Sequence, residues 1–226
     1  MPAVDFGPKV DKEVERIETS EELTEKDKET LFEYKRDMEV EGLSSGRIFK
    51  LLCHTRKIAE QLGDKNLVDA TEDDIKDLVA WVERRDLAEW TKTDYRRIIK
   101  RFFKWENGGE YPEKVEWVST TYSGNKEKLP EKLITEDDVE KLIDAAKNPR
   151  NEALIAVMWE TGARPGEYLD LKIDDIEDRR NGKKVIVEGK TGARRLPLLS
   201  SVPYLSTWLS QHPAAGEPDA PWAQLP

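Results

Sequence analysis

The chain of 226 residues is long enough for one large domain or two modest ones, and it is 37 % charged and 37 % apolar, a balance typical of a water-soluble, mostly helical protein. No apolar run approaches the roughly 20 residues that span a bilayer, and the first residues lack the apolar core of a signal peptide. The single cysteine, Cys53, excludes an internal disulfide and fits a reducing compartment. We therefore expect a cytoplasmic protein with no membrane partner.

The formal net charge of −10 argues against a nucleic-acid partner, but the charges are distributed unevenly along the chain. Residues 43–57 contain four bases and no acid, and residues 84–104 contain eight bases and three acids. Two basic stretches therefore interrupt an acidic chain, and each is able to form a local basic surface.

The first half of the chain predicts a lead-in followed by helices. Residues 1–20 are polar and charged, and we predict that they form a flexible lead-in. Apolar residues then recur at helical spacing, Ser44 and Thr91 stand at helix starts, and Thr71 with Asp74 resembles a capping box. The four helices predicted within a domain of residues 21–107 span residues 24–41, 44–62, 72–85 and 91–106.

The fourth of these helices separates its apolar residues from its basic ones. Its apolar residues fall at i, i+3, i+4, i+7 and i+8 and predict one buried stripe, formed by Tyr95, Ile98, Ile99, Phe102 and Phe103. Five bases fall outside the stripe: Arg96, Arg97, Lys100, Arg101 and Lys104. A solvated face and a surface for phosphate backbones both explain this arrangement, and the helix alone does not decide between them.

Residues 108–130 carry glycines and prolines without a sustained period, which predicts an interdomain linker. The second domain, residues 131–226, begins with a capped helix over residues 135–147. The next helix starts at Pro149 and ends at Gly162, and it is apolar almost all round, which is typical of a buried helix.

The pattern then changes to extended segments. Residues 184–188 are rich in β-branched side chains, residues 194–198 form a second extended run, and five residues lie between them. This arrangement predicts a β-hairpin with its turn at residues 189–193. A short helix near residues 203–210 and a proline-rich end follow.

The hairpin turn contains Gly189-Lys190-Thr191, which resembles the end of a nucleotide-binding loop. Such a loop requires another glycine five residues before Gly189, where this chain has Lys184. It also requires a helix after the threonine, whereas the residues that follow are strand-like and include Pro197. We therefore interpret the segment as a hairpin tip that presents Lys190.

A second candidate site lies upstream, at Thr161-Gly-Ala-Arg164-Pro-Gly-Glu167. Gly162 interrupts the chain after a helix, and Arg164 precedes Pro165, which favours a new helix start. An arginine held at such a corner presents a bidentate fork to a phosphate, with Glu167 placed to orient it. Taken alone, the Arg-x-x-Glu spacing is also that of an ordinary surface ion pair.

Together, "ALIAVMWETGARPGEYLDLKIDDI" (residues 153–176) and "KVIVEGKTGARRLPL" (residues 184–198) resemble the tyrosine recombinase, or phage integrase, family of archaeal-type site-specific recombinases. The resemblance implies a mainly α fold: an N-terminal four-helix SAM-like core-binding domain, and then the N-terminal part of an α+β catalytic domain with a small β-hairpin. It also implies an enzyme that binds double-stranded DNA and cleaves and rejoins it through a 3′-phosphotyrosyl intermediate.

The resemblance assigns roles to individual residues. Arg164 matches the arginine that contacts the non-bridging oxygens of the scissile phosphate, Glu167 matches the acid that steadies it, and Lys190 matches the lysine that protonates the leaving 5′ hydroxyl. No metal and no cofactor are implied, because the phosphotyrosyl link conserves the bond energy. The expected DNA-binding residues are Arg47, Lys50, Arg56, Lys92, Arg96, Arg97, Lys100, Arg101 and Lys104.

The chain departs from the family after the hairpin. A complete member carries a His-x-x-Arg box and a tyrosine nucleophile there, but the two histidines are His54 and His212, with Ala215 three residues after the latter. Tyr204 is the only tyrosine beyond the hairpin, too close to it to be the nucleophile, and we expect it to have a packing role. We expect the chain to stop within the catalytic domain, to be inactive alone, and to form a tetramer on DNA only with the missing part.

Two further hypotheses remain open. The chain could be a naturally short, catalytically inactive module that occupies recombination sites, and a reading frame that continues into a His-x-x-Arg box and a late tyrosine would separate that hypothesis from an interrupted recombinase. The other alternative is a helical regulator or interaction protein unrelated to recombination.

Overall fold

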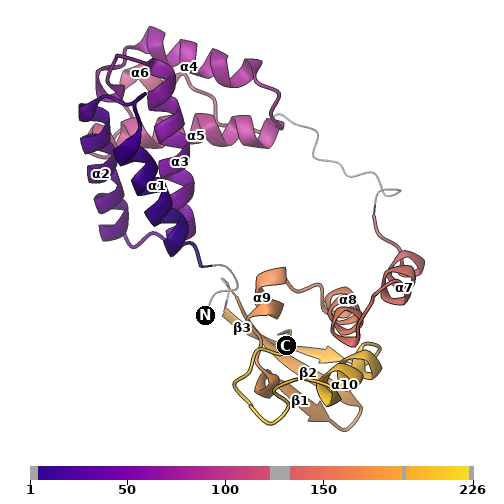
Figure 1. Ribbon diagram of the computed structural model, residues 1–226. Helices are drawn as coiled ribbons and strands as arrows, with labels where there is room; N and C mark the ends of the chain where they lie inside the picture. The colour runs from indigo at the N-terminus through magenta and orange to yellow at the C-terminus, as the bar shows by residue number, and fades with distance from the viewer. Residues whose placement is uncertain (1–4, 123–132, 190–191, 224–226) are drawn as a thin grey trace. The chain divides into compact units, whose positions relative to one another are not determined.

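The computed structural model describes residues 5–122, 133–189 and 192–223 (Figure 1). Contacts divide the chain into two compact units, Asp5–Lys126 and Glu127–Pro226. We call the first the helical unit and the second the sheet unit, and each is described by itself. Within the described residues, no helix is both long enough and apolar enough to cross a bilayer.

Threonine side chains cap two helices of the helical unit, whereas Ser44 stands at the start of α3 without a side-chain capping hydrogen bond. The side chain of Thr24 accepts a hydrogen bond from the Asp27 amide, and Thr71 forms a complete capping box with Asp74. The four helices predicted between residues 24 and 106 are confirmed, although the last begins after Ala88 and not at Thr91. The elements are α1 (Gly7–Thr19), α2 (Glu25–Val40), α3 (Ser45–Leu62), the 3-10 turn η1 (Leu67–Asp69), α4 (Glu72–Arg84), α5 (Glu89–Glu106) and α6 (Glu113–Glu116).

The prediction of a flexible lead-in over residues 1–20 is wrong for the described part of that segment, because residues 7–19 form α1. Val10 and Ile17 are buried in the core of the helical unit, and Val14 packs against it. Their spacing of four and three residues places them on one face of a helix. The apolar face carries only three residues among many charged ones, so the composition of the segment hides it.

The apolar stripe predicted on α5 is confirmed, since each of its five residues is at most 3 % exposed. The linker prediction is wrong for residues 108–118, because Val115 and Val118 belong to the same core. The ammonium of Lys114 also donates to the carbonyl of Ala70 at 3.1 Å. The helical unit therefore continues past α5 through α6, and residues 123–132 lie outside the described part of the chain.

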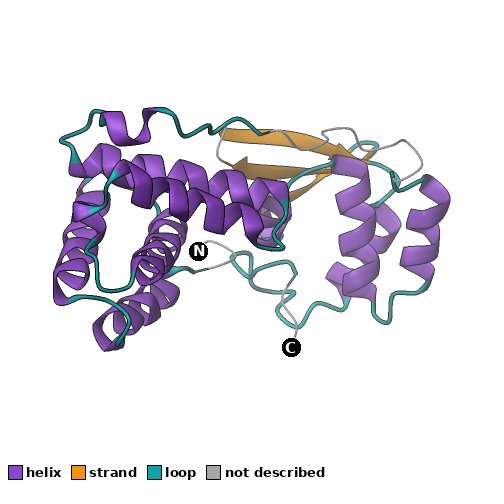
Figure 2. Cartoon of the chain, turned by 90° about the horizontal axis from the view of Figure 1, so that it is seen from above, coloured by secondary structure: helices purple, strands orange, loops and turns teal. Residues whose placement is uncertain are grey.

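The sheet unit combines short helices with a three-stranded antiparallel sheet in the order β1-β2-β3 (strands in orange in Figure 2). The predicted hairpin is confirmed as β2 and β3, with Val187 paired to Arg194 and Gly189 to Gly192. The third strand, β1, was not predicted, because Ile-Glu-Asp-Arg contains a single apolar residue. The elements are α7 (Glu136–Asp144), α8 (Pro149–Thr161), α9 (Pro165–Leu169), the 3-10 turn η3 (Ile173–Asp175), β1 (Ile176–Arg179), β2 (Gly182–Gly189), β3 (Gly192–Leu198) and α10 (Val202–Ser210).

The composition of α8 predicted a helix buried on all sides, and this prediction is wrong. It buries Ala153, Ala156 and Val157 against the core of the sheet unit, while Met158 and Trp159 are 40 % and 47 % exposed. The helix packs against α7 and α10 and contacts β3. These neighbours leave part of its circumference open among the described residues.

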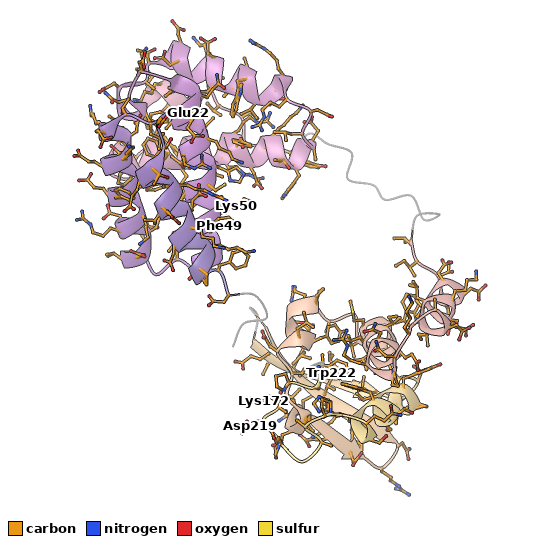
Figure 3. All side chains as sticks on the ribbon, viewed as in Figure 1. Glu22, Phe49, Lys50, Lys172, Asp219 and Trp222 are labelled. Carbon is orange, nitrogen blue, oxygen red and sulfur yellow. The ribbon has the colours of Figure 1, made fainter. Side chains whose placement is uncertain are left out.

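The segment after α10 returns to the body of the sheet unit. Trp222 is 1 % exposed and its indole nitrogen donates to the carbonyl of Tyr168. Nearby, the ammonium of Lys172 pairs with Asp219 at 2.6 Å (Figure 3). The proline-rich end is therefore anchored by one buried tryptophan next to α9, the short helix that carries the candidate site.

Candidate active site

Residues 162–164 form a sharp connection between α8 and α9, which we call the arginine turn. Gly162 adopts a left-handed conformation with φ 57°, which ends α8 at little cost because glycine has no side chain beyond hydrogen. Arg164 is the N-cap of α9, and Pro165 occupies the first turn of that helix, where a missing amide hydrogen is not needed. The local sequence therefore fixes the backbone on both sides of Arg164.

The arginine is held by Glu167 from the same helix. The backbone amide of Arg164 donates to Oε2 of Glu167 at 2.9 Å, and Nη1 of its guanidinium donates to Oε1 at 3.0 Å. The arginine side chain is 64 % exposed, whereas that of Glu167 is 5 % exposed. The predicted pairing is therefore present, and it fixes one edge of the guanidinium while leaving most of the group open to solvent.

A second arginine, which the sequence did not single out as a site residue, shares the same carboxylate. Nη2 of Arg194 on β3 donates to Oε2 of Glu167 at 2.7 Å, and its side chain is 38 % exposed. Gly189 at the end of β2 makes this approach possible, because a methyl group there would lie 2.2 Å from Oε1 of Glu167. The carboxylate thus ties the arginine turn to β3 and lies close to the end of β2.

The pKa of Glu167 lies below the ordinary value for a glutamate. The largest cause is the hydrogen bond from the Arg164 backbone amide, which outweighs the opposing effect of burial, and the two guanidinium groups add to it. Glu167 therefore stays ionised at neutral pH, and the cluster of Arg164, Glu167 and Arg194 carries one net positive charge.

Lys190 and Thr191 lie outside the described residues. The structure places the strands on either side of the predicted lysine, with Gly189 paired to Gly192. The role assigned to Lys190 stays a prediction.

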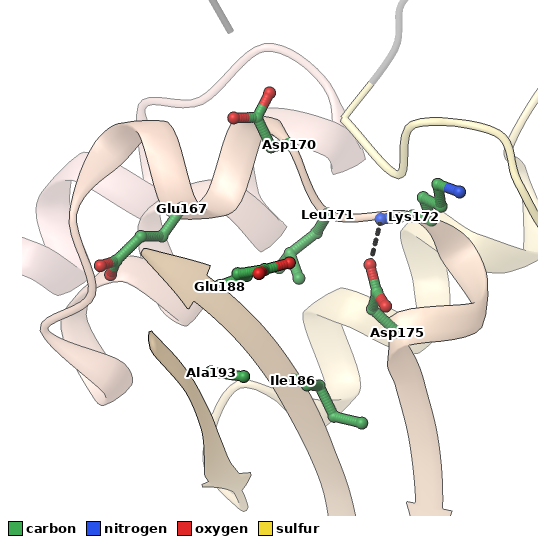
Figure 4. Close-up of a pocket in the computed structure, with 8 residues that line it drawn as sticks. All are labelled: Glu167, Asp170, Leu171, Lys172, Asp175, Ile186, Glu188 and Ala193. Carbon is green, nitrogen blue, oxygen red and sulfur yellow. Dashed lines mark hydrogen bonds between the residues drawn. The ribbon is translucent and has the colours of Figure 1, made fainter. Parts of the chain in front are cut away.

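A pocket of about 600 Å³ lies beside this cluster in the sheet unit (Figure 4). Carboxylates predominate in its lining, which consists of Glu167, Asp170, Leu171, Lys172, Asp175, Ile186, Glu188 and Ala193. Such a lining repels phosphate, so the pocket is not a site for a DNA backbone. Across the described ranges, no three carboxylate, histidine or cysteine side chains are grouped so that they could hold a metal ion.

The basic residues predicted to bind DNA divide into two groups. One group shares a pocket of about 450 Å³ in the helical unit, which we call the basic pocket and which is lined by Arg47, Arg97, Lys100, Arg101, Lys104, Tyr111 and Thr120. The ammonium groups of Lys100 and Lys104 lie 5.0 and 4.8 Å from the centre of the Tyr111 ring. The exposed ring therefore supports two cations at the pocket wall.

The other group lies outside the basic pocket, and each of its members pairs with a carboxylate, as Arg101 within the pocket also does with Glu41 at 2.7 Å. Arg56 is 13 % exposed and its Nε pairs with the fully buried Glu13 at 2.7 Å. Arg96, also 13 % exposed, pairs with Glu83, and Lys92 pairs with Glu89 at 3.3 Å. Lys50 pairs with Asp94 at 2.5 Å. The folded chain thus gives these four cations intramolecular partners that their sequence positions did not reveal.

The remaining candidates occupy structural positions. Tyr204 packs against the core of the sheet unit, in line with the packing role expected for it. Nδ1 of His212 accepts a hydrogen bond from the Ala214 amide, so that Nε2 carries the proton and donates to the carbonyl of Pro221 at 3.1 Å. Nδ1 of His54 lies 2.7 Å from the carbonyl of Lys50, and its ring packs against Tyr95.

Comparison with solved structures shows a shared fold. The fold is shared with the Tn1549 transposon integrase in complex with transposon right end DNA, at a TM-score of 0.61 and 14 % identity over 80 % of this chain and 65 % of that one. It is also shared with the XerH site-specific recombinase bound to difH substrate, at a TM-score of 0.53 and 20 % identity over 93 % of this chain and 69 % of that one.

Sequence comparison shows a family match for the sheet unit. Residues 132–221 match the phage integrase family. The chain is 28 % identical over 101 residues to the tyrosine recombinase XerA of Pyrococcus horikoshii, and 34 % identical over 79 residues to a tyrosine recombinase of Synechococcus elongatus. These matches cover 43 % and 34 % of this chain, and 32 % and 24 % of the two relatives, which are therefore spanned only in part. The family match thus lies in residues 132–221, and both relatives are tyrosine recombinases.

Proposed function

We propose that the chain is part of a site-specific DNA recombinase that binds duplex DNA and cleaves and rejoins it through a 3′-phosphotyrosyl intermediate. The observation that carries the proposal is the exposed guanidinium of Arg164, fixed by the buried carboxylate of Glu167 within the region that matches the family. A cation held in one geometry stabilises a phosphate best when charge accumulates on the non-bridging oxygens in the transition state.

The proposed reaction uses few groups. A tyrosine oxygen attacks the scissile phosphorus as its hydroxyl proton passes to solvent, the bond from phosphorus to the 5′ oxygen breaks, and that oxygen takes a proton from Lys190. Arg164 binds the non-bridging oxygens, and Glu167 keeps it oriented. The 5′ alkoxide is a poor leaving group without a proton donor, which gives the lysine its role. Religation reverses these steps without nucleotide hydrolysis, because the phosphotyrosyl link conserves the bond energy.

DNA binding is assigned to the basic pocket of the helical unit. Its cations lie close to one another, and exposed Tyr111 offers an apolar surface between them. The salt dependence of binding tests this assignment, because each cation that contacts a phosphate steepens the fall of affinity with salt concentration.

The experiment measures binding of a labelled duplex by fluorescence anisotropy over a series of salt concentrations. Replacing Arg97 and Lys104 by Gln should weaken binding and lower the salt slope by about 2, since each lost phosphate contact removes about one unit. The control, Arg36→Gln, removes a charge that is 72 % exposed on α2 and is not among the residues lining the basic pocket. Equal salt slopes for the unsubstituted chain and the double variant would contradict the assignment of DNA binding to the basic pocket.

A DNA-binding module that does not cleave is the second candidate. The packing of Tyr204 and the structural hydrogen bonds of His212 favour it, because both side chains have structural roles in the sheet unit. We expect the 226-residue polypeptide to bind a nicked duplex without forming a covalent adduct. An adduct that survives denaturation and disappears with Tyr204→Phe would make Tyr204 the nucleophile and reject this candidate.

A further inference from the structure

A second carboxylate, Glu160, lies on the other side of the arginine turn. It stands in the last turn of α8, four residues before Arg164. Its Oε1 accepts hydrogen bonds from the amides of Leu199 and Ser200 at 2.7 and 3.1 Å. Its Oε2 accepts from the Ser201 amide at 2.9 Å and from the Ser201 hydroxyl. One side chain thus receives four hydrogen bonds from the segment between β3 and α10.

These hydrogen bonds connect the end of α8 to the start of α10. Helix α10 begins at Val202, and its N-terminal end carries amides without partners inside the helix, which an anion stabilises. Burial by itself raises the pKa of Glu160, but the Ser201 hydroxyl and the three amides outweigh burial and place the pKa below its usual range. The carboxylate is therefore ionised at neutral pH and accepts hydrogen bonds on both oxygens.

Glu160 and Glu167 together bracket the arginine turn. Glu160 ties the end of α8 to the segment that follows β3. Glu167 ties α9 to Arg194 within β3. The turn is thus fixed at one end to β3 and at the other end to the segment that directly follows β3. A displacement of α8 relative to β3 would move the backbone of Arg164 even while its ion pair with Glu167 remained intact.

We propose that Glu160 is a positioning residue for Arg164, acting through the clamp that it forms with residues 199–201. The inference rests on the proposed function, in which Arg164 contacts a DNA phosphate. It differs from a purely structural role, since loss of the clamp lowers the contribution of Arg164 to phosphate binding and not only the stability of the sheet unit.

The test is a double-mutant cycle on the 226-residue chain, with a fluorescein-labelled duplex of mixed sequence as the probe. In the unsubstituted chain, Arg164→Ala should weaken DNA binding about tenfold, the size expected for a charged hydrogen bond to phosphate. In the Glu160→Gln background, the same substitution should weaken binding less than about threefold, because the arginine is already misplaced.

The matched control is Asp138→Asn. Asp138 also accepts from a backbone amide and a hydroxyl at a helix start in the sheet unit, those of Thr135, but it lies outside the arginine turn. In this background Arg164→Ala should keep its full effect. A second clamp variant, Ser201→Ala, removes only the hydroxyl donor and preserves the fold, and it should reduce the Arg164→Ala effect to about fivefold.

The outcomes are distinguishable. If Arg164→Ala weakens binding tenfold in every background, the arginine assignment stands and the inference about Glu160 is overturned. If Arg164→Ala has no effect even in the unsubstituted chain, the proposed contact with phosphate fails, and the inference fails with it. If Asp138→Asn reduces the effect as much as Glu160→Gln does, the clamp contributes only stability and positioning is rejected.

Discussion

Arg164 is exposed to solvent and the cations of the basic pocket are exposed or half-buried, but the chain holds them in different ways. Arg164 is bound through its backbone and its guanidinium to a carboxylate that is 5 % exposed. In the basic pocket, Lys100 and Lys104 lie over an exposed tyrosine ring, and Arg97 is 3.9 Å from Asp94. A fixed cation suits one phosphate in one geometry, whereas loosely held cations suit a backbone of any sequence.

Arg56 shows a third arrangement, in which the cation stabilises the packing of two helices. Its guanidinium joins α3 to the fully buried Glu13 of α1. The sequence offered no distinction between Arg56 and the residues of the basic pocket, since all stand in basic stretches. Arg164 and Arg56 both meet a buried carboxylate, but the arginine side chains are 64 % and 13 % exposed, whereas Lys100 and Lys104 of the basic pocket lie over a tyrosine ring.

The largest effect is expected from breaking the buried pair. Glu13→Ala should lower the free energy of unfolding by about 3 kcal/mol, because a cavity would replace the fully buried carboxylate and Arg56 would keep only Glu60 as a partner. Urea unfolding followed by circular dichroism measures this change. The control is Glu72→Ala, which removes an exposed pair with Lys76 and should cost less than about 1 kcal/mol. Similar losses for the two variants would contradict the structural role given to Arg56.

A smaller effect is expected where the hairpin meets the arginine turn. Gly189→Ala should destabilise the sheet unit by about 1–3 kcal/mol, because the added methyl group would displace the Glu167 carboxylate. Gly166→Ala is the matched control, since no described atom outside its own helix lies within 4 Å of the position of its methyl group. Thermal unfolding of the two variants compares them, and equal melting temperatures would show that the close approach at Gly189 is not required.

The parts of the fold that could be predicted from sequence are those formed by residues close to one another along the chain. Thr24, Thr71 and Thr135 each bind an amide three residues on, so the starts of their helices were visible in the sequence. Helix α1 was missed because its few buried residues stand among charges. The exposed face of α8 was missed because composition does not reveal how many neighbours a helix has.

In the candidate site, too, the sequence revealed only contacts between residues that are close along the chain. The Arg164–Glu167 pair spans three residues and was predicted from its spacing. Arg194 lies 27 residues from Glu167, and Leu199 lies 39 residues from Glu160, so only the folded hairpin brings these groups together. The sequence predicted Gly189 as part of a turn, whereas its closeness to Glu167 depends on the register of β2 and β3.

The central claim, that Arg164 makes a specific contact with a DNA phosphate, is tested most directly by comparing two single substitutions in the same unit. Arg180 is an exposed arginine between β1 and β2, outside the arginine turn, and its loss changes the net charge by the same amount. Fluorescence anisotropy with a labelled duplex should show about a tenfold loss of affinity for Arg164→Ala and less than about a twofold loss for Arg180→Ala. Equal losses for the two variants would mean that Arg164 acts only through net charge, and would contradict the account.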